Sequence, residues 1–349
     1  MPPIEEYQEF LSGIWDREYF TNNGPLVQEL ELRLKNYLGL KNFIYVTNGT
    51  IALQIAIQAL ELKGEIITTP FSYVATTSSI VWEHCTPVYV DIKSNTFNID
   101  EAKIADAITQ KTTAILATHV FGNPCEIESI QRIAKKHKLK VIYDAAHCFG
   151  TKYKGDSVFA FGDISTASFH ATKLFHTVEG GGVFSKSEYL IKKMGYLRNF
   201  GHDGPANFNG VGINGKNSEL HAAMGLCNLA HIDDVIQKRR RQSQYYDESL
   251  NMIDILSMQS INKDADCFNF AYYPIVFETE SYLLKAISLL EQNSIFPRRY
   301  FYPSLTSLDY VSGHCPISDS ISRRVLCLPL YHDLTWEDQD LIISLIKKV

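Results

Sequence analysis

The chain has 349 residues, of which 45% are hydrophobic, and its formal net charge is −6. A chain of this length can form one large domain with a sizeable core and a smaller second domain. The modest acidic balance gives no electrostatic reason to expect nucleic acid or an anionic membrane surface as a partner.

The cysteines and the first residues predict the cellular compartment. The seven cysteines are odd in number and lack C-x-x-C spacing, a usage typical of free thiols in a reducing cytosol. The opening stretch, MPPIEEYQEF, is acidic and lacks the apolar core of a signal peptide. No apolar run approaches the about 20 residues of a membrane span, so a cytoplasmic protein without a membrane anchor is expected.

The first half of the chain alternates helices with short apolar strands. After the turn signal Asn23-Gly24-Pro25, regularly spaced leucines predict an amphipathic helix that ends at Gly39. Strands are expected at 43–47, 65–70, 86–92, 112–120 and 141–144, and helices at 49–60, 73–82, 100–108 and 126–137. Buried strands that alternate with helices predict an α/β fold, with a mainly parallel sheet covered by helices on both faces.

The second half has shorter segments. Residues 201–217 are rich in Gly and Asn and too polar for a core element, and a helix begins at Ser218. Strands are expected at 166–170, 181–186 and 270–277, and helices at 188–200, 281–292 and from 336 onward. The pattern predicts a large domain of residues 1–235 and a smaller α/β domain of residues 236–349.

Polar and aromatic residues fall near the carboxyl ends of the predicted strands, namely Asn48, Tyr73, His119 and Asp144. Ligands of parallel α/β sheets bind at this edge. The small-residue turn Asn48-Gly49-Thr50 opens a helix, and N–H groups at the positive end of a helix dipole can bind a phosphate. Taken alone, this turn is better interpreted as a tight connection with a helix cap.

Lys173 is the strongest candidate for chemistry. Its neighbours in 168–175 are mostly small or aromatic, and the next acidic residue is Glu179. Such surroundings favour the neutral amine, which forms a Schiff base with an aldehyde and can thereby hold pyridoxal phosphate. Asp144, at the end of an apolar strand, can pair with the protonated pyridine nitrogen of that cofactor. Separately, the two would be interpreted as a surface lysine and a helix cap; together they favour a cofactor site.

Three motifs resemble a known family: Asp144-Ala145-Ala146-His147, SFHATK at 168–173, and EGG at 179–181. They are similar to the DegT/DnrJ/EryC1/StrS family of nucleotide-sugar aminotransferases. The resemblance runs from about Thr21 to about Ile232 and more weakly to the end. It implies the fold-type I architecture of pyridoxal-phosphate-dependent transferases, with a mainly parallel central sheet and a smaller C-terminal α/β domain. Some relatives carry histidine in place of the lysine and act as dehydratases, so Lys173 favours transamination.

The resemblance also implies roles for residues around the cofactor. Tyr73 matches the aromatic residue that stacks on the ring, and His147 matches a residue near the ring hydroxyl. Ser168 matches a hydroxyl that binds the phosphate, and with Lys173 and Asp144 present the turn at Gly49 and Thr50 is also expected to bind it. Each has a plainer interpretation: a core tyrosine, a core histidine with satisfied hydrogen bonds, or a serine that begins a strand.

The resemblance also implies residues that take part in subunit assembly and in substrate binding. Asn214 matches an asparagine that relatives send across a dimer interface to the phosphate of the neighbouring cofactor, although a turn asparagine needs no such role. A homodimer with shared active sites is therefore expected. Arg298 and Arg299 are candidates for binding the substrate diphosphate, because guanidinium groups match its geometry. No metal is expected, since the histidines show no ligand spacing such as H-E-x-x-H.

The resemblance implies transfer of an amino group, with glutamate as the expected donor, to a nucleotide-linked keto-sugar. The loop that follows Lys173 looks shorter than in relatives that act at sugar carbon 3 and closer to those that act at carbon 4. The expected product is therefore dTDP-4-amino-4,6-dideoxyglucose, made for a surface polysaccharide such as an O-antigen or for a glycosylated metabolite. The alternatives are action at carbon 3, action on a UDP- or GDP-linked sugar, and a non-catalytic regulator or binding module with the same fold.

Overall fold

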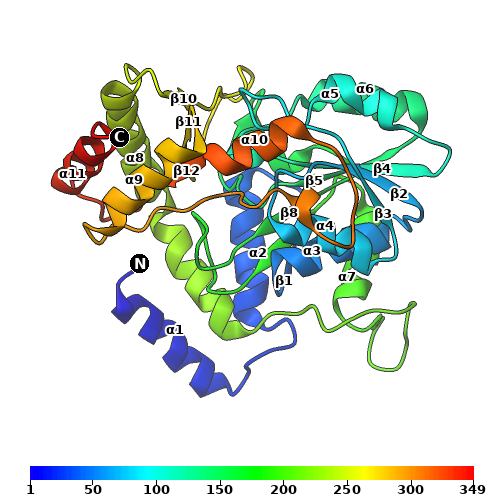
Figure 1. Ribbon diagram of the computed structural model, residues 1–349. Coiled ribbons are helices and arrows are strands. Elements are labelled where there is room, and N and C mark those ends of the chain that lie inside the picture. Colours follow the sequence, from blue (N-terminus) through cyan, green and yellow to red (C-terminus); the bar gives the residue numbers. More distant parts are fainter.

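The computed structural model describes residues 1–349 and is built around a seven-stranded sheet with the strand order β1-β9-β8-β5-β4-β2-β3 (Figure 1). The pairs β2–β3, β2–β4, β4–β5 and β5–β8 are parallel, whereas β9 runs antiparallel to both β1 and β8. The predicted mainly parallel sheet is thus confirmed. Its strands are β1 (Ile44–Val46), β2 (Glu65–Thr68), β3 (Thr86–Tyr89), β4 (Thr112–Thr118), β5 (Lys140–Asp144), β8 (Ile164–Ser168) and β9 (Gly181–Phe184).

Helices cover both faces of this sheet, and each face has its own hydrophobic core. Adjacent strand residues such as Ile66 and Ile67, or Ile142 and Tyr143, belong to different cores because successive side chains of a strand point to opposite faces. The helices around the sheet are α2 (Pro25–Leu38), α3 (Gly49–Ala59), α4 (Val74–Trp82), α5 (Glu101–Ile104), α6 (Ile127–His137) and α7 (Glu188–Arg198). An N-terminal helix that the sequence analysis did not predict, α1 (Ile4–Arg17), packs on α8 (Glu219–Leu250).

The C-terminal part forms a second, smaller α/β unit. Its antiparallel sheet contains β10 (Leu256–Met258), β11 (Tyr273–Phe277) and β12 (Val325–Leu328), which lie beside α9 (Glu280–Glu291), α10 (Pro316–Arg324) and α11 (Trp336–Ile346). Buried residues such as Leu283 and Ile342 give this unit a core of its own. A smaller C-terminal α/β unit therefore follows the large one, as predicted.

Helix α8 connects the two units without a break (Figure 1). Its first half contributes Leu226 and Ile232 to the large core, and its last turns contribute Tyr246 and Leu250 to the small core. The division at 235/236 stays a prediction, since it falls inside this continuous helix and within the stretch where the helix passes from one core to the other.

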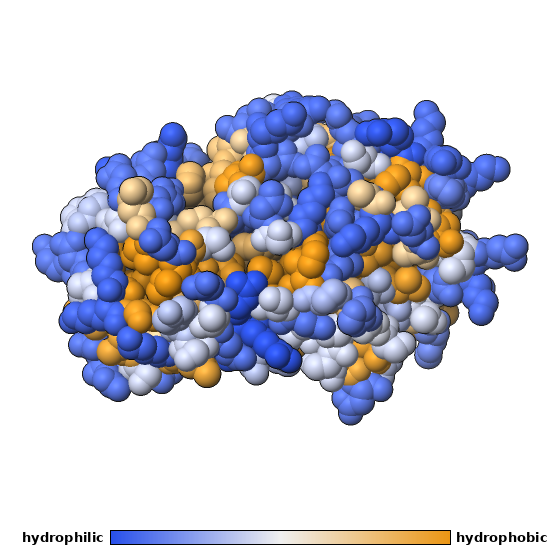
Figure 2. Space-filling view, turned by 45° about the horizontal axis from the view of Figure 1, so that its top comes forward, coloured by the Kyte–Doolittle hydropathy of each residue, from blue (hydrophilic) through white to orange (hydrophobic).

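An aromatic cluster and a buried carboxylate hold the small unit against the large sheet. Phe301 packs between Phe71 and Phe121, with ring centroids 5.5 and 5.6 Å away. The Asp91 carboxylate accepts hydrogen bonds from the backbone N–H groups of Ile317 and Ser318 at 2.9 and 2.8 Å, at the start of α10. In the space-filling view, hydrophobic residues form a band across the middle of one face, bordered by hydrophilic residues (Figure 2). The contacts of Phe301 and Asp91 position the segment that contains Arg298.

Candidate active site

A cavity of about 480 Å³ lies at the carboxyl ends of the parallel strands. The turn after β1, the ends of β4, β5 and β8, and the loop after β8 all contribute to its wall. Eight of the ten residues expected in the site line this cavity: Gly49, Thr50, Tyr73, Asp144, His147, Ser168, Lys173 and Arg298. The tertiary structure thus brings together residues that are more than a hundred positions apart in the sequence.

Lys173 lies in the loop between β8 and β9, and its amine makes no hydrogen bond or ion pair. Burial lowers the pKa of Lys173 to about 8, although the Asp144 carboxylate acts in the opposite direction. A substantial fraction of the amine is therefore neutral near physiological pH, which is the form that attacks an aldehyde.

Asp144 ends β5 and is buried. One carboxylate oxygen, Oδ2, accepts a hydrogen bond from the Thr76 hydroxyl at 2.7 Å, and the other accepts one from the Ala146 N–H at 3.2 Å. Burial raises the pKa of Asp144, whereas these two hydrogen bonds and the Lys173 charge oppose the rise. A buried carboxylate held in this way is suited to pair with a cationic ring nitrogen in the cavity.

The N-terminus of α3 packs closely against Ser168 in the wall of the cavity. Asn48 caps α3 by accepting the Ile51 N–H at 2.8 Å, which leaves the N–H groups of Gly49 and Thr50 available to a ligand. A Cβ atom at Gly49 would lie 2.9 Å from the Ser168 Cβ, and one at Gly181 would lie 2.4 Å from the Asn48 carbonyl carbon. A side chain at either position would collide with these atoms, so both positions require glycine.

His147 and Tyr73 present rings to the same cavity. His147 accepts the Phe121 N–H through Nδ1 at 3.3 Å, and burial holds its pKa well below the usual range, so the ring is neutral. Tyr73 precedes α4 and is 59% exposed. An exposed tyrosine on a cavity wall is available for stacking, unlike the core tyrosine of the alternative interpretation.

Asn214 and Arg299 lie outside the cavity. The exposed Asn214 accepts a hydrogen bond from Lys216 Nζ at 2.6 Å. Arg299 pairs with Glu280 at 3.0 Å, donates to the Arg323 carbonyl, and lies over the Tyr302 ring at 3.6 Å. His119 is also absent from the cavity wall, because its ring is buried against Tyr143.

The sequence analysis missed a hydroxyl network behind Asp144. The Ser72 hydroxyl lies 2.6 Å from that of Thr76 and 3.1 Å from that of Thr118, and Thr76 in turn donates to Asp144. No sequence motif distinguishes these hydroxyls from ordinary helix and strand residues. The signal that identifies them is the packing of the first turn of α4 beside the ends of β4 and β5.

The arrangement fits pyridoxal phosphate, since one cavity combines a lysine of lowered pKa, a buried carboxylate without a cationic hydrogen-bond partner and free N–H groups at a helix N-terminus. The profile of the DegT/DnrJ/EryC1/StrS aminotransferase family matches residues 4–347. The chain belongs to this family. It is therefore a pyridoxal-phosphate-dependent sugar aminotransferase, as the motifs predicted.

Individual relatives match along nearly their whole length. A dTDP-4-amino-4,6-dideoxy-D-glucose transaminase of Shigella dysenteriae is 42% identical, with 100% of this chain and 97% of the relative covered. A protein of the same name from Escherichia coli is 38% identical, covering 99% and 95%. The solved structure of DesI in the presence of its TDP-sugar product is 29% identical and superposes with a TM-score of 0.93, covering 100% of this chain and 90% of DesI. No helix of the chain combines the length and apolarity needed to cross a membrane.

Proposed function

We propose that this aminotransferase moves the amino group of glutamate to dTDP-4-keto-6-deoxyglucose and forms dTDP-4-amino-4,6-dideoxyglucose. The observation that carries the proposal is the identity of 42% and 38% to two transaminases named for that product, over nearly the full length of each chain. GDP-perosamine synthases, whose name points to another nucleotide, are less similar at 30% identity.

When bound, pyridoxal phosphate supplies an electron sink that stabilises the carbanion formed at the donor's α-carbon. Lys173 would hold the cofactor through its amine, and the same Nζ, when free, would move a proton to and from the donor's α-carbon. The Asp144 carboxylate would keep the ring nitrogen protonated, and Thr76 fixes the orientation of that carboxylate. The N-terminus of α3 and Ser168 would bind the phosphate.

Arg298 is the residue we assign to the substrate diphosphate. It lines the cavity, and its guanidinium forms no ion pair. The companion prediction for Arg299 requires this side chain to leave Glu280, with which it forms an ion pair, when substrate binds. The two arginines can be separated by the KM for the nucleotide sugar, which should rise in Arg298→Gln well above its value in Arg299→Gln.

The proposed reaction is tested by incubating the purified protein with cofactor, glutamate and a panel of dTDP-, UDP- and GDP-linked keto-sugars. Mass spectrometry should detect an amino-sugar product for the dTDP-linked 4-keto-6-deoxyglucose, and NMR should place the amine at carbon 4. Loss of the visible absorbance of the bound cofactor on addition of glutamate identifies the donor. An amine at carbon 3, or turnover confined to another nucleotide, would replace the proposed substrate with one of the alternatives.

We further propose a two-fold dimer in which Asn214 reaches the cofactor phosphate of the other subunit. The support is the exposed position of Asn214 in the polar loop 201–217 and its absence from the cavity of its own chain. Phe208 and Val211 of the same loop are 66% and 90% exposed, which is costly for apolar side chains unless a partner covers them. The cytoplasmic location and the role in a polysaccharide or glycosylated metabolite stay predictions.

Mixed dimers test this assembly. Lys173→Ala disables a site from its own chain, and Asn214→Asp sets a carboxylate against the phosphate of the neighbouring site. Two-fold symmetry then places both lesions of a mixed dimer in one site and leaves the other site intact. Because about half the dimers are mixed after random exchange, roughly a quarter of wild-type activity should return. If each variant is inactive alone, mixed dimers form and no activity returns, Asn214 acts within its own subunit.

A further inference from the structure

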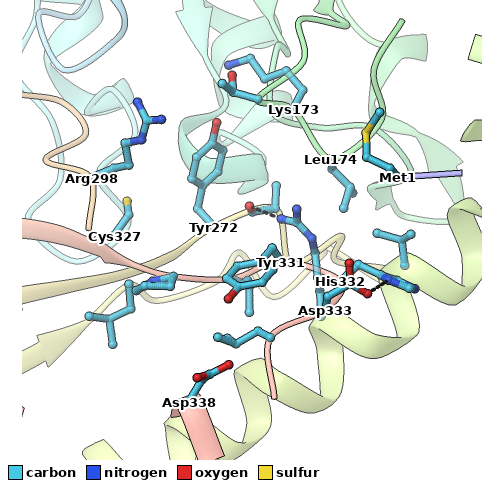
Figure 3. A pocket seen from close by; sticks show the side chains of 18 of the residues that line it. Met1, Lys173, Leu174, Tyr272, Arg298, Cys327, Tyr331, His332, Asp333 and Asp338 are labelled. Atoms are coloured by element: carbon cyan, nitrogen blue, oxygen red, sulfur yellow. Dashed lines mark hydrogen bonds and ion pairs between the residues drawn. The ribbon is translucent and has the colours of Figure 1, made fainter. Parts of the chain in front are cut away.

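A second cavity, of about 1010 Å³, lies on the other side of the Lys173 loop (Figure 3). We call it the lysine-loop cavity; its wall is formed by residues 1–3, residues from 171–176, the middle of α8, Ala271 and Tyr272, and residues from 293–300 and 327–342. Thr172, Lys173, Arg298 and Tyr300 line both this cavity and the cofactor cavity. A molecule bound in the lysine-loop cavity would therefore contact the segment that carries the reactive lysine.

Arg239 of α8 provides an unpaired positive charge in this wall. Its Nη1 donates to the Ala271 carbonyl at 2.9 Å, but its Nε is buried without a hydrogen-bond partner, and no carboxylate pairs with the guanidinium. Burial lowers the pKa of Arg239 to about 10, and the neighbouring Tyr272 opposes that change. A half-buried cation whose Nε is fully buried and which has no counter-ion is costly, and an anion in the cavity would lower that cost.

Tyr272 supplies a second free donor beside Arg239. Its hydroxyl is buried and has no hydrogen-bond partner. Its ring centroid lies 4.6 Å from that of His147, so the side chain stands between the cofactor cavity and Arg239. Figure 3 shows the Tyr272 ring between Arg298 and Lys173, with the hydroxyl directed toward the lysine side of the cavity.

Acidic side chains also line the cavity. Asp234, Asp333 and Asp338 line it and are exposed, and Asp333 lies 2.9 Å from His332. Asp333 and Asp338 lie at the end of the cavity away from Lys173 (Figure 3). Arg298, Lys173 and the N-terminal Met1 also line the cavity and offset these carboxylates, and the planar fork of the Arg239 guanidinium matches the geometry of a carboxylate.

We propose that the lysine-loop cavity is a binding site for a small organic carboxylate, with Arg239 as its charged anchor and Tyr272 as a second donor. The donor amino acid and the oxo acid that remains after transfer are both carboxylates of this class. Their identification as the occupants rests on the proposed function, whereas the site itself rests on the unpaired donors. A carboxylate held here would alter the position of the lysine loop and hence the rate of turnover.

Calorimetric titration of the cofactor-loaded protein with succinate tests the site directly. Succinate has neither an amino nor a carbonyl group and cannot enter the transamination cycle, so binding is measured independently of activity. We expect one succinate per chain, no binding of neutral succinamide, and weaker binding of inorganic phosphate. Arg239→Gln should weaken succinate binding about tenfold or more, because a charge-assisted hydrogen bond is lost. Tyr272→Phe should weaken it to a smaller extent.

Arg240→Gln is the matched control, because Arg240 is the exposed neighbour of Arg239 on the same helix. This substitution should leave succinate binding unchanged. Arg239→Lys retains the charge and should keep part of the affinity, and thermal unfolding of each variant reports whether the fold is intact. The proposal is overturned if the protein does not bind succinate, or if Arg239→Gln binds succinate as tightly as the wild type. It is also overturned if phosphate binds more tightly than succinate, or if succinate binding is lost in Arg298→Gln but not in Arg239→Gln. A protein that binds succinate but does not aminate the dTDP-sugar would retain the site and reject the proposed reaction.

Discussion

Thr76 is the residue through which the environment of Asp144 can be altered without touching the cofactor or the substrate. Its buried hydroxyl donates to Asp144 Oδ2 at 2.7 Å. Thr76→Val keeps the shape of the side chain and removes this donor. Because the hydrogen bond counteracts the effect of burial on the pKa of Asp144, its loss raises that pKa further. The shared proton then shifts toward the carboxylate, and the ring nitrogen is less fully protonated.

The size of the effect follows from the kind of hydrogen bond. A bond from a neutral donor to a charged acceptor contributes about 1.5–3 kcal/mol, and about 1.4 kcal/mol corresponds to a factor of ten. We therefore expect kcat/KM for the amino donor to fall by roughly ten- to a hundredfold. The acidic limb of the pH–rate profile should move to higher pH, since Asp144 must be ionised to act and becomes protonated at a higher pH in the variant.

Thr77 provides a matched control for this experiment. It is the next residue of α4, it is also buried, and its hydroxyl lies 3.0 Å from that of Tyr89 instead of bonding to Asp144. Thr77→Val should lower the melting temperature about as much as Thr76→Val but leave kcat/KM and the pH profile close to wild type. Equal kinetics in the two variants would show that Thr76 has a structural role only, and the reasoning about Asp144 would be refuted.

Four further predictions concern the same site and its support. Lys173→Ala should lower turnover by at least about 10³-fold with an unchanged circular-dichroism spectrum; near-wild-type steady-state rates would exclude the lysine. Asp144→Asn should cost about 10²-fold or more and loosen the cofactor, as measured by its dissociation; a loss of only a few-fold would leave Asp144 as a helix cap. The rate at which apoprotein takes up cofactor, followed by absorbance, should rise with pH and level off above about 8, because the Lys173 amine is then neutral; a rise continuing toward the ordinary lysine pKa would contradict the shift. Glu219→Gln should lower the free energy of unfolding by about 1.5–3 kcal/mol in denaturant titrations, since the fully buried carboxylate accepts the N–H groups of Leu26 and Val27 at the start of α2; an unchanged midpoint would show that the cap contributes nothing.

Local patterns in the sequence were sufficient for the elements of the large sheet and for choosing Lys173 and Asp144 as candidate site residues. Helix α2 follows from the spacing of its leucines and from Gly39, which adopts a φ of 64° at its end. The buried strands follow from short apolar runs bounded by turn residues, and the lysine from its apolar neighbours. These signals are readable because each depends on residues that are close together in the chain.

The contacts between distant segments were decided by the tertiary structure alone. The antiparallel direction of β9 depends on how the chain returns after the lysine loop, and nothing in the sequence of four residues, GGVF, specifies it. Thr76, Arg239 and Tyr272 have roles only because α4 packs beside β5 and because α8 and β11 meet next to the lysine loop. A hydroxyl or guanidinium looks the same in the sequence whether water or a buried partner surrounds it, and its burial, which sets its pKa and its need for a partner, is determined by segments far away in the chain.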